Sequence, residues 1–329
     1  MRLLSFHSSG EAPNRALRTW NCSKVLPFNI MSAASELTRN RNGGDNCGTS
    51  VHGESRACAV AATRGAVIVN ADDWGRNVPT TGRSLKCYLR GVVSSVSAMV
   101  YMEDSERAAD LARQYGIDAG LHLNFTASFS ARRCPHNLLE HQARLARFLR
   151  SHRVAPVLFH PGLARSFEYV VKAQQEEYER LFATAAKRVD GHHHMHLCAN
   201  VIFQKLLPEG AIVRRNLTFR PGEKSCLNRL YRRWEDRRLV RRHRVADFFF
   251  DLKPLDQCRM KGICELGARF NVEIETHPIN DDEYSFLLNG KMEQCANNLA
   301  VARGYILSAR QTVHNDTAHA AVIHTGDIQ

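Results

Sequence analysis

The chain has 329 residues, of which 44% are hydrophobic, and its formal net charge is +12 at pH 7. That length allows one large domain or two ordinary ones, and no apolar run is long enough to cross a membrane. Residues 1–65 show no sustained hydrophobic period and no secretory signal. We therefore expect an irregular or disordered N-terminal extension over residues 1–65 and one folded domain over residues 66–329.

From residue 66 onward, short apolar runs alternate with helical patterns. The predicted strands cover residues 66–70, 92–100, 118–125, 188–197, 211–217, 246–252 and 270–277, the fourth of them running into a loop. The predicted helices cover residues 79–90, 103–116, 136–152 and 167–187. Strands that alternate with helices favour a parallel sheet with crossover connections. The pattern predicts an α/β fold, a (β/α) barrel of about seven strands.

Acidic and imidazole side chains follow the ends of four predicted strands. Asp72 and Asp73 come after the first strand, His122 lies at the end of the third, a histidine cluster ends the fourth, and His277 ends the last. Because the carboxyl ends of parallel strands meet at one side of the sheet, we expect these groups to converge. Carboxylate and imidazole ligands with open positions suit a catalytic divalent metal ion. Consecutive side chains of an extended chain point apart, so one aspartate can bind metal while the other reaches its water.

The histidine cluster reads VDGHHHMHL over residues 189–197. Such a run is either a surface accident or a metal-related element, and its internal position favours the second interpretation. If the segment stays extended, His192, His194 and His196 share one face. Asp190 lies where a carboxylate can orient an imidazole.

Four motifs in this order, NADDWG, GLHLN, DGHHHMH and THP, resemble those of the YdjC-like carbohydrate deacetylases, a group with chitooligosaccharide and hopanoid-associated members. The resemblance covers roughly residues 66–310 and implies a distorted, polysaccharide-deacetylase-like (β/α) barrel. It also implies that Asp73, His122 and His192 bind one divalent ion, Mg²⁺ or Zn²⁺, and that Asp72 is the catalytic base.

Two positions depart from the family pattern. Trp74 follows the aspartate pair where the family often has phenylalanine. Val170 stands four residues before Gln174, where the family usually has an acid. These departures concern the surroundings of the site and leave the ligand set intact.

The motifs predict a metal-dependent hydrolase that removes an N-acetyl group from an amino sugar, carried on an oligosaccharide or a glycolipid. Asp72 would take the proton of the attacking water. His277 is the candidate acid that protonates the leaving amine, with His194 second. The predicted substrate-binding residues are His194, His196, Arg214 and Trp74.

Two other functions stay open. A different metal-dependent hydrolase, such as a phosphoesterase or a deformylating amidase, could use the same scaffold, although no glycine-rich phosphate loop is evident. A protein without catalysis could bind nucleic acid or membrane through residues 229–244. In that segment eight arginines oppose Glu235 and Asp236 and give a net charge of +6.

The basic segment is predicted to be a helix, because Leu230 and Trp234 lie four residues apart and can bury one apolar face. Its arginines are then either a solvated face or a contact for anionic lipid headgroups. We expect the second, with no nucleic-acid partner.

Ten cysteines are scattered along the chain without a CxxC pair, which suits free thiols in a reducing cytosol. The sequence therefore predicts a cytoplasmic protein at the membrane periphery, with a homodimer as the candidate assembly.

Overall fold

The computed structural model describes residues 65–219, 224–296 and 301–307. Except for Gly65, the predicted N-terminal extension lies outside the described residues, so its character stays a prediction. The folded domain begins with a strand at Ala66, at the residue where the sequence pattern changes.

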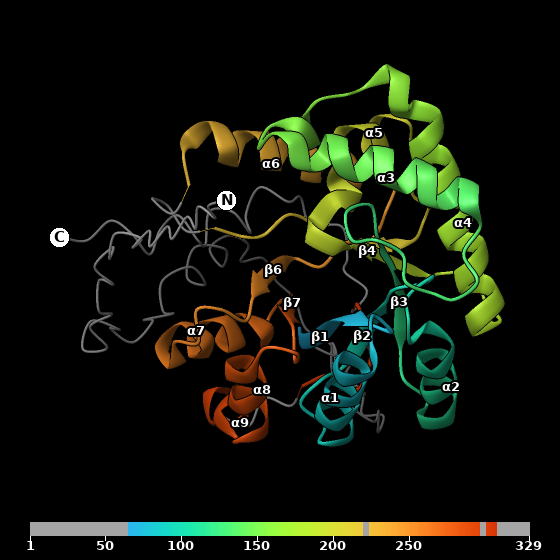
Figure 1. Cartoon of the computed structure of the whole chain (residues 1–329). Helices are drawn as coiled ribbons and strands as arrows, with labels where there is room; N and C mark the ends of the chain where they lie inside the picture. The colour runs from blue at the N-terminus through green and yellow to red at the C-terminus, as the bar shows by residue number, and fades with distance from the viewer. Residues whose placement is uncertain (1–64, 220–223, 297–300, 308–329) are drawn as a thin grey trace, which may run out of the picture. The chain divides into compact units, whose positions relative to one another are not determined.

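Seven parallel strands form one sheet in the order β5-β4-β3-β2-β1-β7-β6. The strands are β1 (Ala66–Trp74), β2 (Ser95–Ala98), β3 (Ala119–Leu123), β4 (Arg188–Gly191), β5 (Ile212–Val213), β6 (Phe248–Asp251) and β7 (Asn271–Thr276). Figure 1 shows β1 and β7 near the centre, with α1, α8 and α9 below them and α3 to α6 above. The sheet is a curled half-barrel with β5 and β6 at its two ends, which confirms the predicted distorted (β/α) barrel of about seven strands.

Helices follow most of the strands. The longer ones are α1 (Val78–Leu89), α2 (Ser105–Tyr115), α3 (His136–Ser151), α4 (Ala164–Phe182), α6 (Cys226–Leu239) and α7 (Gln257–Gly267). The shorter ones are α5 (Ala199–Phe203), α8 (Asp281–Leu288), α9 (Lys291–Ala296) and the 3₁₀ turns η2 (Ala155–Val157), η3 (Pro161–Leu163) and η4 (His192–Leu197). Helix α2 ends at Gly116, whose φ of 62° is the left-handed conformation that glycine adopts without strain.

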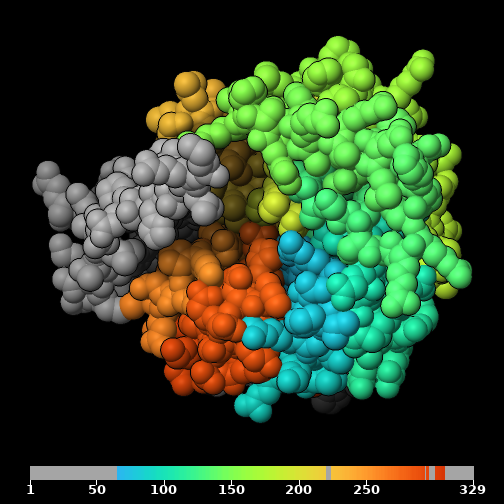
Figure 2. All heavy atoms as spheres, in the orientation of Figure 1, coloured from blue at the N-terminus to red at the C-terminus, as the bar shows by residue number. Residues whose placement is uncertain are grey.

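The first and last elements of the domain lie side by side. Figure 2 shows the blue residues of β1 and α1 next to the red residues of α8 and α9. Arg83 of α1 donates a hydrogen bond to the carbonyl of Ile279, 2.8 Å away, and pairs with Asp281 at 2.6 Å. This contact joins the segment after β7, which begins with His277, to α1, the helix that follows β1.

The two faces of the sheet have different surroundings. Val67, Val69 and Ala71 of β1 belong to the main hydrophobic core, which includes residues of the surrounding helices. Asn70 and Asp72 alternate with them and join a buried polar network. Because successive side chains of a strand point to opposite faces, one face packs on the helices and the other is polar. The polar face is where a reactive site can form.

No helix in the described part of the chain is both long and apolar enough to cross a bilayer. Six of the described cysteines have free thiols. Cys258 is disulfide-bonded, so the prediction of free thiols throughout is wrong at that position.

The packing of α6 makes the stability of the domain depend on pH through Glu235. This side chain is 4% exposed, and its Oε2 accepts a hydrogen bond from Asn216 Nδ2 at 3.1 Å. Burial raises the pKa of Glu235 to about 7. An acid whose pKa is raised by folding stabilises the fold fully below its unfolded pKa, and this contribution is lost as pH rises through the folded pKa.

We therefore expect the free energy of unfolding to fall between about pH 5 and pH 8. With about 1.36 kcal/mol per pKa unit, the loss is at most on the order of 3 kcal/mol. The variant Glu235→Gln should be more stable than the wild type at pH 8 and less pH-dependent, as measured by urea unfolding. The exposed Glu179→Gln is the control. Parallel pH curves for the wild type and Glu235→Gln would contradict this role of Glu235.

Candidate active site

A bulge at the end of β1 sets the directions of the two aspartates. The pairing of β1 with β2 breaks register between Ala71 and Trp74, and Asp73 has a φ of 64°. As a result Asp73 Oδ1 and Asp72 Oδ2 both face His122 Nε2, at 3.4 and 3.9 Å. The prediction that the two carboxylates point apart is wrong, because a bulge interrupts the alternation of the strand. Both carboxylates therefore serve one site.

Asp73, His122 and His192 present their ligand atoms within 4.8 Å of one another, and all three side chains are buried. His192 Nδ1 lies 2.9 Å from Asp73 Oδ1. Asp73 Oδ1 and His122 Nε2 are buried, yet neither makes a hydrogen bond of acceptable geometry. Buried polar atoms without partners are costly and rare. One carboxylate and two imidazoles aimed at a common point fit a divalent metal ion.

Neighbouring groups hold these side chains in place. Asp190 Oδ1 lies 2.8 Å from His122 Nδ1, so the carboxylate orients that imidazole with Nε2 toward Asp73. Arg76 donates to Asp73 Oδ2 at 2.8 Å, which leaves Oδ1 for the site. Burial alone would lower the pKa of His122, but the carboxylates of Asp72 and Asp190 raise it to about 10.

Arg214, directly after β5, binds the second aspartate. Its Nη1 and Nη2 donate to Asp72 Oδ2 and Oδ1 at 2.7 and 2.8 Å. Its other contacts are Asp190 at 2.9 Å, Glu273 at 2.7 Å and Glu275 at 3.3 Å. Burial would raise the pKa of Asp72, but Arg214 and His122 hold it below its ordinary value. Arg214 is 1% exposed and fully engaged, so the prediction that it contacts substrate is corrected: it positions Asp72.

The histidine cluster is a 3₁₀ turn, η4, and is not extended. His193 and His194 have φ values of 55° and 58°, which turn the chain and send its imidazoles in different directions. His194 Nε2 lies 3.4 Å from Glu275 Oε1. His196 is fully buried, its Nε2 lies 2.9 Å from the carbonyl oxygen of Arg214, and burial lowers its pKa to about 3. The predicted shared face is wrong, and His196 is a neutral interior residue without access to substrate.

The sequence of this domain matches a known protein family. A family model described as YdjC-like protein matches residues 66–307. The chain belongs to the YdjC-like family. The motif resemblance is thereby confirmed over the whole described domain, and the motif residues Asp72, Asp73, His122 and His192 are the ones that the fold brings together.

Relatives of this YdjC-like chain are named as deacetylases. It is 34% identical over 136 residues to a chitooligosaccharide deacetylase of Serratia marcescens, covering 40% of this chain and 50% of the relative. It is 28% identical to the carbohydrate deacetylase of Mus musculus, covering 51% and 55%, and 28% identical to that of Vibrio cholerae, covering 77% and 92%. The matched segments span about half of the Serratia and mouse proteins and nearly all of the Vibrio one.

A solved structure supports the fold alone. An Enterococcus faecalis protein named for cellobiose-phosphate cleavage superposes with a TM-score of 0.51 at 16% identity, covering 73% of this chain and 96% of that one. The YdjC-like chain therefore shares its architecture with a protein that it barely resembles in sequence.

Two residues that were predicted to act on the substrate, Trp74 and His277, lie outside the ligand group of this YdjC-like domain. Trp74 is 0% exposed, and its indole N–H donates to the carbonyl of Ala108 in α2 at 3.1 Å. Its predicted substrate contact is corrected, because a ring enclosed between sheet and helix has no surface to offer. His277 is half-buried after β7, and its backbone N–H donates to Glu283. Within the described residues its imidazole makes no hydrogen bond or ion pair, and it is electrostatically coupled to Asp251.

Two acids of the YdjC-like site were not predicted from the sequence. Glu273 and Glu275 alternate along β7, which is buried on both faces, and both reach Arg214. Glu273 Oε2 also accepts a hydrogen bond from the Tyr305 hydroxyl at 2.5 Å. Two acids that alternate with apolar residues in a predicted strand are the signal that could have identified them. Buried charges are retained when they are paired.

Proposed function

We propose that this chain is a metal-dependent hydrolase that removes an N-acetyl group from an amino sugar. The observation that carries the proposal is the buried convergence of Asp73, His122 and His192, with two polar atoms left without hydrogen-bond partners. The names of the relatives support an acetylated carbohydrate as the substrate class.

The proposed metal ligands are Asp73 Oδ1, His122 Nε2 and His192, which supply one oxygen and two imidazole nitrogens. A divalent ion bound there would polarise the acetamide carbonyl and lower the pKa of its water. The mixed ligand set suits Zn²⁺ and tolerates Mg²⁺ less naturally, and it leaves coordination positions open.

Asp72 is the proposed base. Arg214 and Asn70 Nδ2, which donates at 2.8 Å, fix its carboxylate and keep it ionised. Its Oδ2 is the oxygen that faces His122 and is placed to take a proton beside the ligand group. A fixed base avoids reorganisation during the reaction, and general base catalysis contributes typically ~10²–10⁴-fold.

The leaving amine needs a proton, because an amide anion does not leave. His277 is the proposed acid, since it follows β7 at the carboxyl edge of the sheet. His194 is the second candidate, because Glu275 pairs with its imidazole and also contacts Arg214, which binds Asp72. Of the two, only His194 is linked to Asp72 through side-chain contacts among the described residues.

Leaving-group chemistry separates the two candidates. We expect the variant that lacks the acid to lose turnover of acetamides while it keeps turnover of an activated acetate ester, whose leaving group needs no proton. His277→Ala and His194→Asn are compared on both substrates. The substitution to asparagine keeps a residue that tolerates the positive φ at position 194. Equal losses on both substrates would show that the residue is not the acid.

The test of the proposed function is acetate release from free, oligomeric and lipid-linked N-acetylglucosamine by metal-loaded and chelated protein. We expect release that depends on metal. A phosphate ester and a formamide are included in the panel, because a phosphoesterase or a deformylating amidase could use the same ligand set. Hydrolysis of either one without acetate release would replace the proposal with that activity.

We also propose a location, an oligomeric state and a membrane contact for this chain. A cytoplasmic location, a homodimer and peripheral contact of residues 229–244 with an anionic membrane are consistent with the proposed function but are not required by it. The exposed apolar and cationic side chains of α6 support the membrane contact.

A further inference from the structure

Helix α6 turns its large apolar side chains outward. Leu227, Leu230 and Trp234 are 80%, 61% and 39% exposed and lie on one stripe of the helix. The buried residues of α6 are Glu235 and Leu239. The prediction that Leu230 and Trp234 bury an apolar face is therefore wrong, because a carboxyl group and one leucine face the domain in their place.

Exposed aromatic rings continue this stripe onto neighbouring segments. Phe203 of α5 is 45% exposed, and its ring centroid lies 5.9 Å from that of Trp234. Phe159 is 46% exposed, with its centroid 6.1 Å from that of Phe203. The guanidinium of Arg238 lies over both the Phe203 and the Trp234 rings, at 4.9 and 5.0 Å. We call this surface the apolar ridge: Leu227, Leu230, Trp234, Phe203 and Phe159.

Unpaired arginines run beside the apolar ridge. Arg233, Arg237 and Arg241 are exposed. Arg233 and Arg237 lie one turn apart on α6, and Arg241 lies in the turn that follows the helix. We call these three residues the arginine stripe. Within the part of the chain that the structure describes, none of them has an ion-pair or hydrogen-bond partner. Of the two acids between them in sequence, Glu235 is buried against Asn216 and Asp236 is bound to Arg215 at 2.8 Å. The surface is therefore both apolar and strongly cationic.

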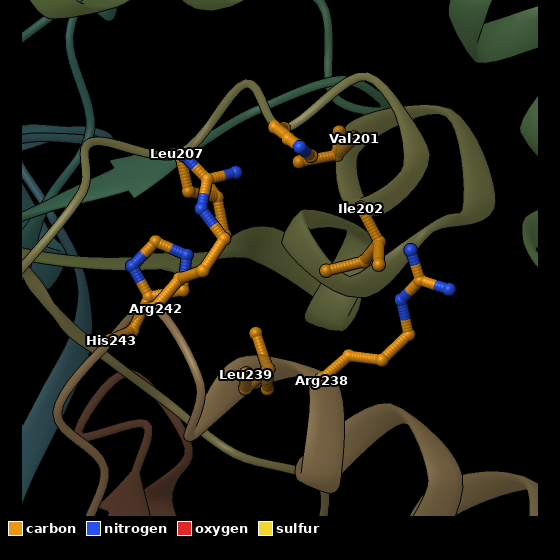
Figure 3. Close-up of a pocket in the computed structure, with 8 residues that line it drawn as sticks. Val201, Ile202, Leu207, Arg238, Leu239, Arg242 and His243 are labelled. Carbon is orange, nitrogen blue, oxygen red and sulfur yellow. The ribbon is translucent and has the colours of Figure 1, made fainter.

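A small pocket of about 50 Å³ lies between α5 and α6 (Figure 3). Its lining combines apolar Val201, Ile202 and Leu239 with cationic Lys205, Arg238 and Arg242. A cavity of this size exceeds the roughly 10–15 Å³ that one water molecule needs, so it has room for a small polar group. Arg242 already pairs with Glu209 at 3.1 Å, and the guanidinium of Arg238 and the ammonium of Lys205 favour an anionic group such as a phosphate oxygen.

We propose that the apolar ridge and its arginine stripe dock on an anionic phospholipid surface. Tryptophan and leucine enter the boundary between headgroups and acyl chains, while arginines remain among the phosphates. Nucleic acid explains the arginines but not Leu227 and Leu230, because bases stack on aromatic rings and gain nothing from exposed aliphatic side chains. The proposal does not rest on the proposed hydrolysis, since no residue of the metal group takes part.

The test is co-sedimentation with vesicles of phosphatidylcholine, alone or with added phosphatidylglycerol, at low and high salt. We expect binding to the anionic vesicles that weakens at high salt, because exposed charges are screened. The tryptophan emission should shift to the blue on binding. That shift should disappear in Trp234→Phe, which keeps an aromatic ring on the apolar ridge.

Two sets of variants distinguish binding through the arginine stripe from binding through the net charge of the protein. Each arginine near an anionic membrane contributes about five-fold in affinity, so Arg233→Gln/Arg237→Gln/Arg241→Gln should weaken binding on the order of 100-fold. The matched control removes the same charge at exposed positions on other elements, Lys86→Gln/Arg90→Gln/Arg132→Gln, and should bind nearly as the wild type does. Leu230→Ser/Trp234→Ser should remove the binding that persists at high salt.

Circular dichroism and an unchanged urea-unfolding midpoint show that each variant is folded. Equal binding to neutral and anionic vesicles would overturn the proposal, as would an equal loss in the control triple variant. Binding to a DNA duplex without binding to vesicles would assign the surface to nucleic acid. Loss of acetate release in the wild-type assay would leave the docking result unaffected, so the two proposals fail separately.

Discussion

Replacing Asp73 with asparagine should abolish metal binding and turnover together. Asp73 Oδ1 is the carboxylate oxygen at the point where His122 and His192 converge, and it has no other hydrogen-bond partner. An amide is neutral, so the site would lose its anionic ligand. We expect metal affinity to fall by more than the roughly 100-fold that loss of a supporting outer group can cause. Metal content after dialysis and calorimetric titration with Zn²⁺ and Mg²⁺ measure this directly.

Asparagine is the informative substitution at this position. Asp73 has a φ of 64°, a conformation that asparagine tolerates better than alanine does. His192→Ala, which removes an imidazole ligand, should give the same loss of metal. The control is His141→Asn: this imidazole of α3 lies 2.9 Å from the Ser166 hydroxyl and is not in the ligand group. Full metal occupancy in Asp73→Asn, or equal loss in His141→Asn, would contradict the ligand assignment.

The fold was predictable because its strands and helices follow local patterns. Short apolar runs that alternate with helical patterns predicted all seven strands, and the glycine stop at Gly116 predicted the end of α2. The convergence of Asp72, Asp73, His122 and His192 followed from one rule, that parallel strands end on one side of the sheet. The order of the elements therefore predicted where these residues meet, whereas the family resemblance implied which of them bind a metal ion.

What the sequence did not predict depends on backbone conformations and long-range pairing. A positive φ at Asp73 and at His193 and His194 is a property of the folded chain, and no residue type at these positions requires it. Arg214 was expected at the substrate, because an arginine at the end of a strand carries no sign of its partner in the sequence. Its partners Asp72 and Glu273 are 142 and 59 residues away, beyond the reach of any periodicity argument.

The prediction of which face of α6 is buried was wrong for a related reason. The spacing of Leu230 and Trp234 identifies a stripe, but not whether that stripe faces the domain or the solvent. In the fold, Asn216 takes Glu235 as a partner, and the hydrogen bond turns the apolar stripe outward. A helix that buries a carboxyl group and exposes a tryptophan indicates a second surface to be covered.

Asp72→Asn should keep the metal and lose most of its turnover. Asp72 is not in the proposed ligand group of Asp73, His122 and His192, so those ligand atoms remain. With His122 and Asp190 it forms a second group that could hold a metal ion, and the metal content of the variant distinguishes the two groups. An amide cannot accept the proton of the attacking water, and we expect kcat to fall by ~10²–10⁴-fold. KM should change little, because no proposed substrate contact is removed. Steady-state acetate release and metal content, measured on the same preparation, test both halves of the statement.

The fold should tolerate this substitution, which makes the loss of turnover interpretable. Without the charge of Asp72, Arg214 still pairs with Asp190, Glu273 and Glu275, so no buried cation is left alone. The matched control is Asp104→Asn, a buried acid before α2 that pairs with Arg107 at 2.6 Å outside the site. We expect that variant to turn over at nearly the wild-type rate. A near-normal kcat in Asp72→Asn would exclude Asp72 as the base, and loss of metal there would show that the carboxylate is itself a ligand.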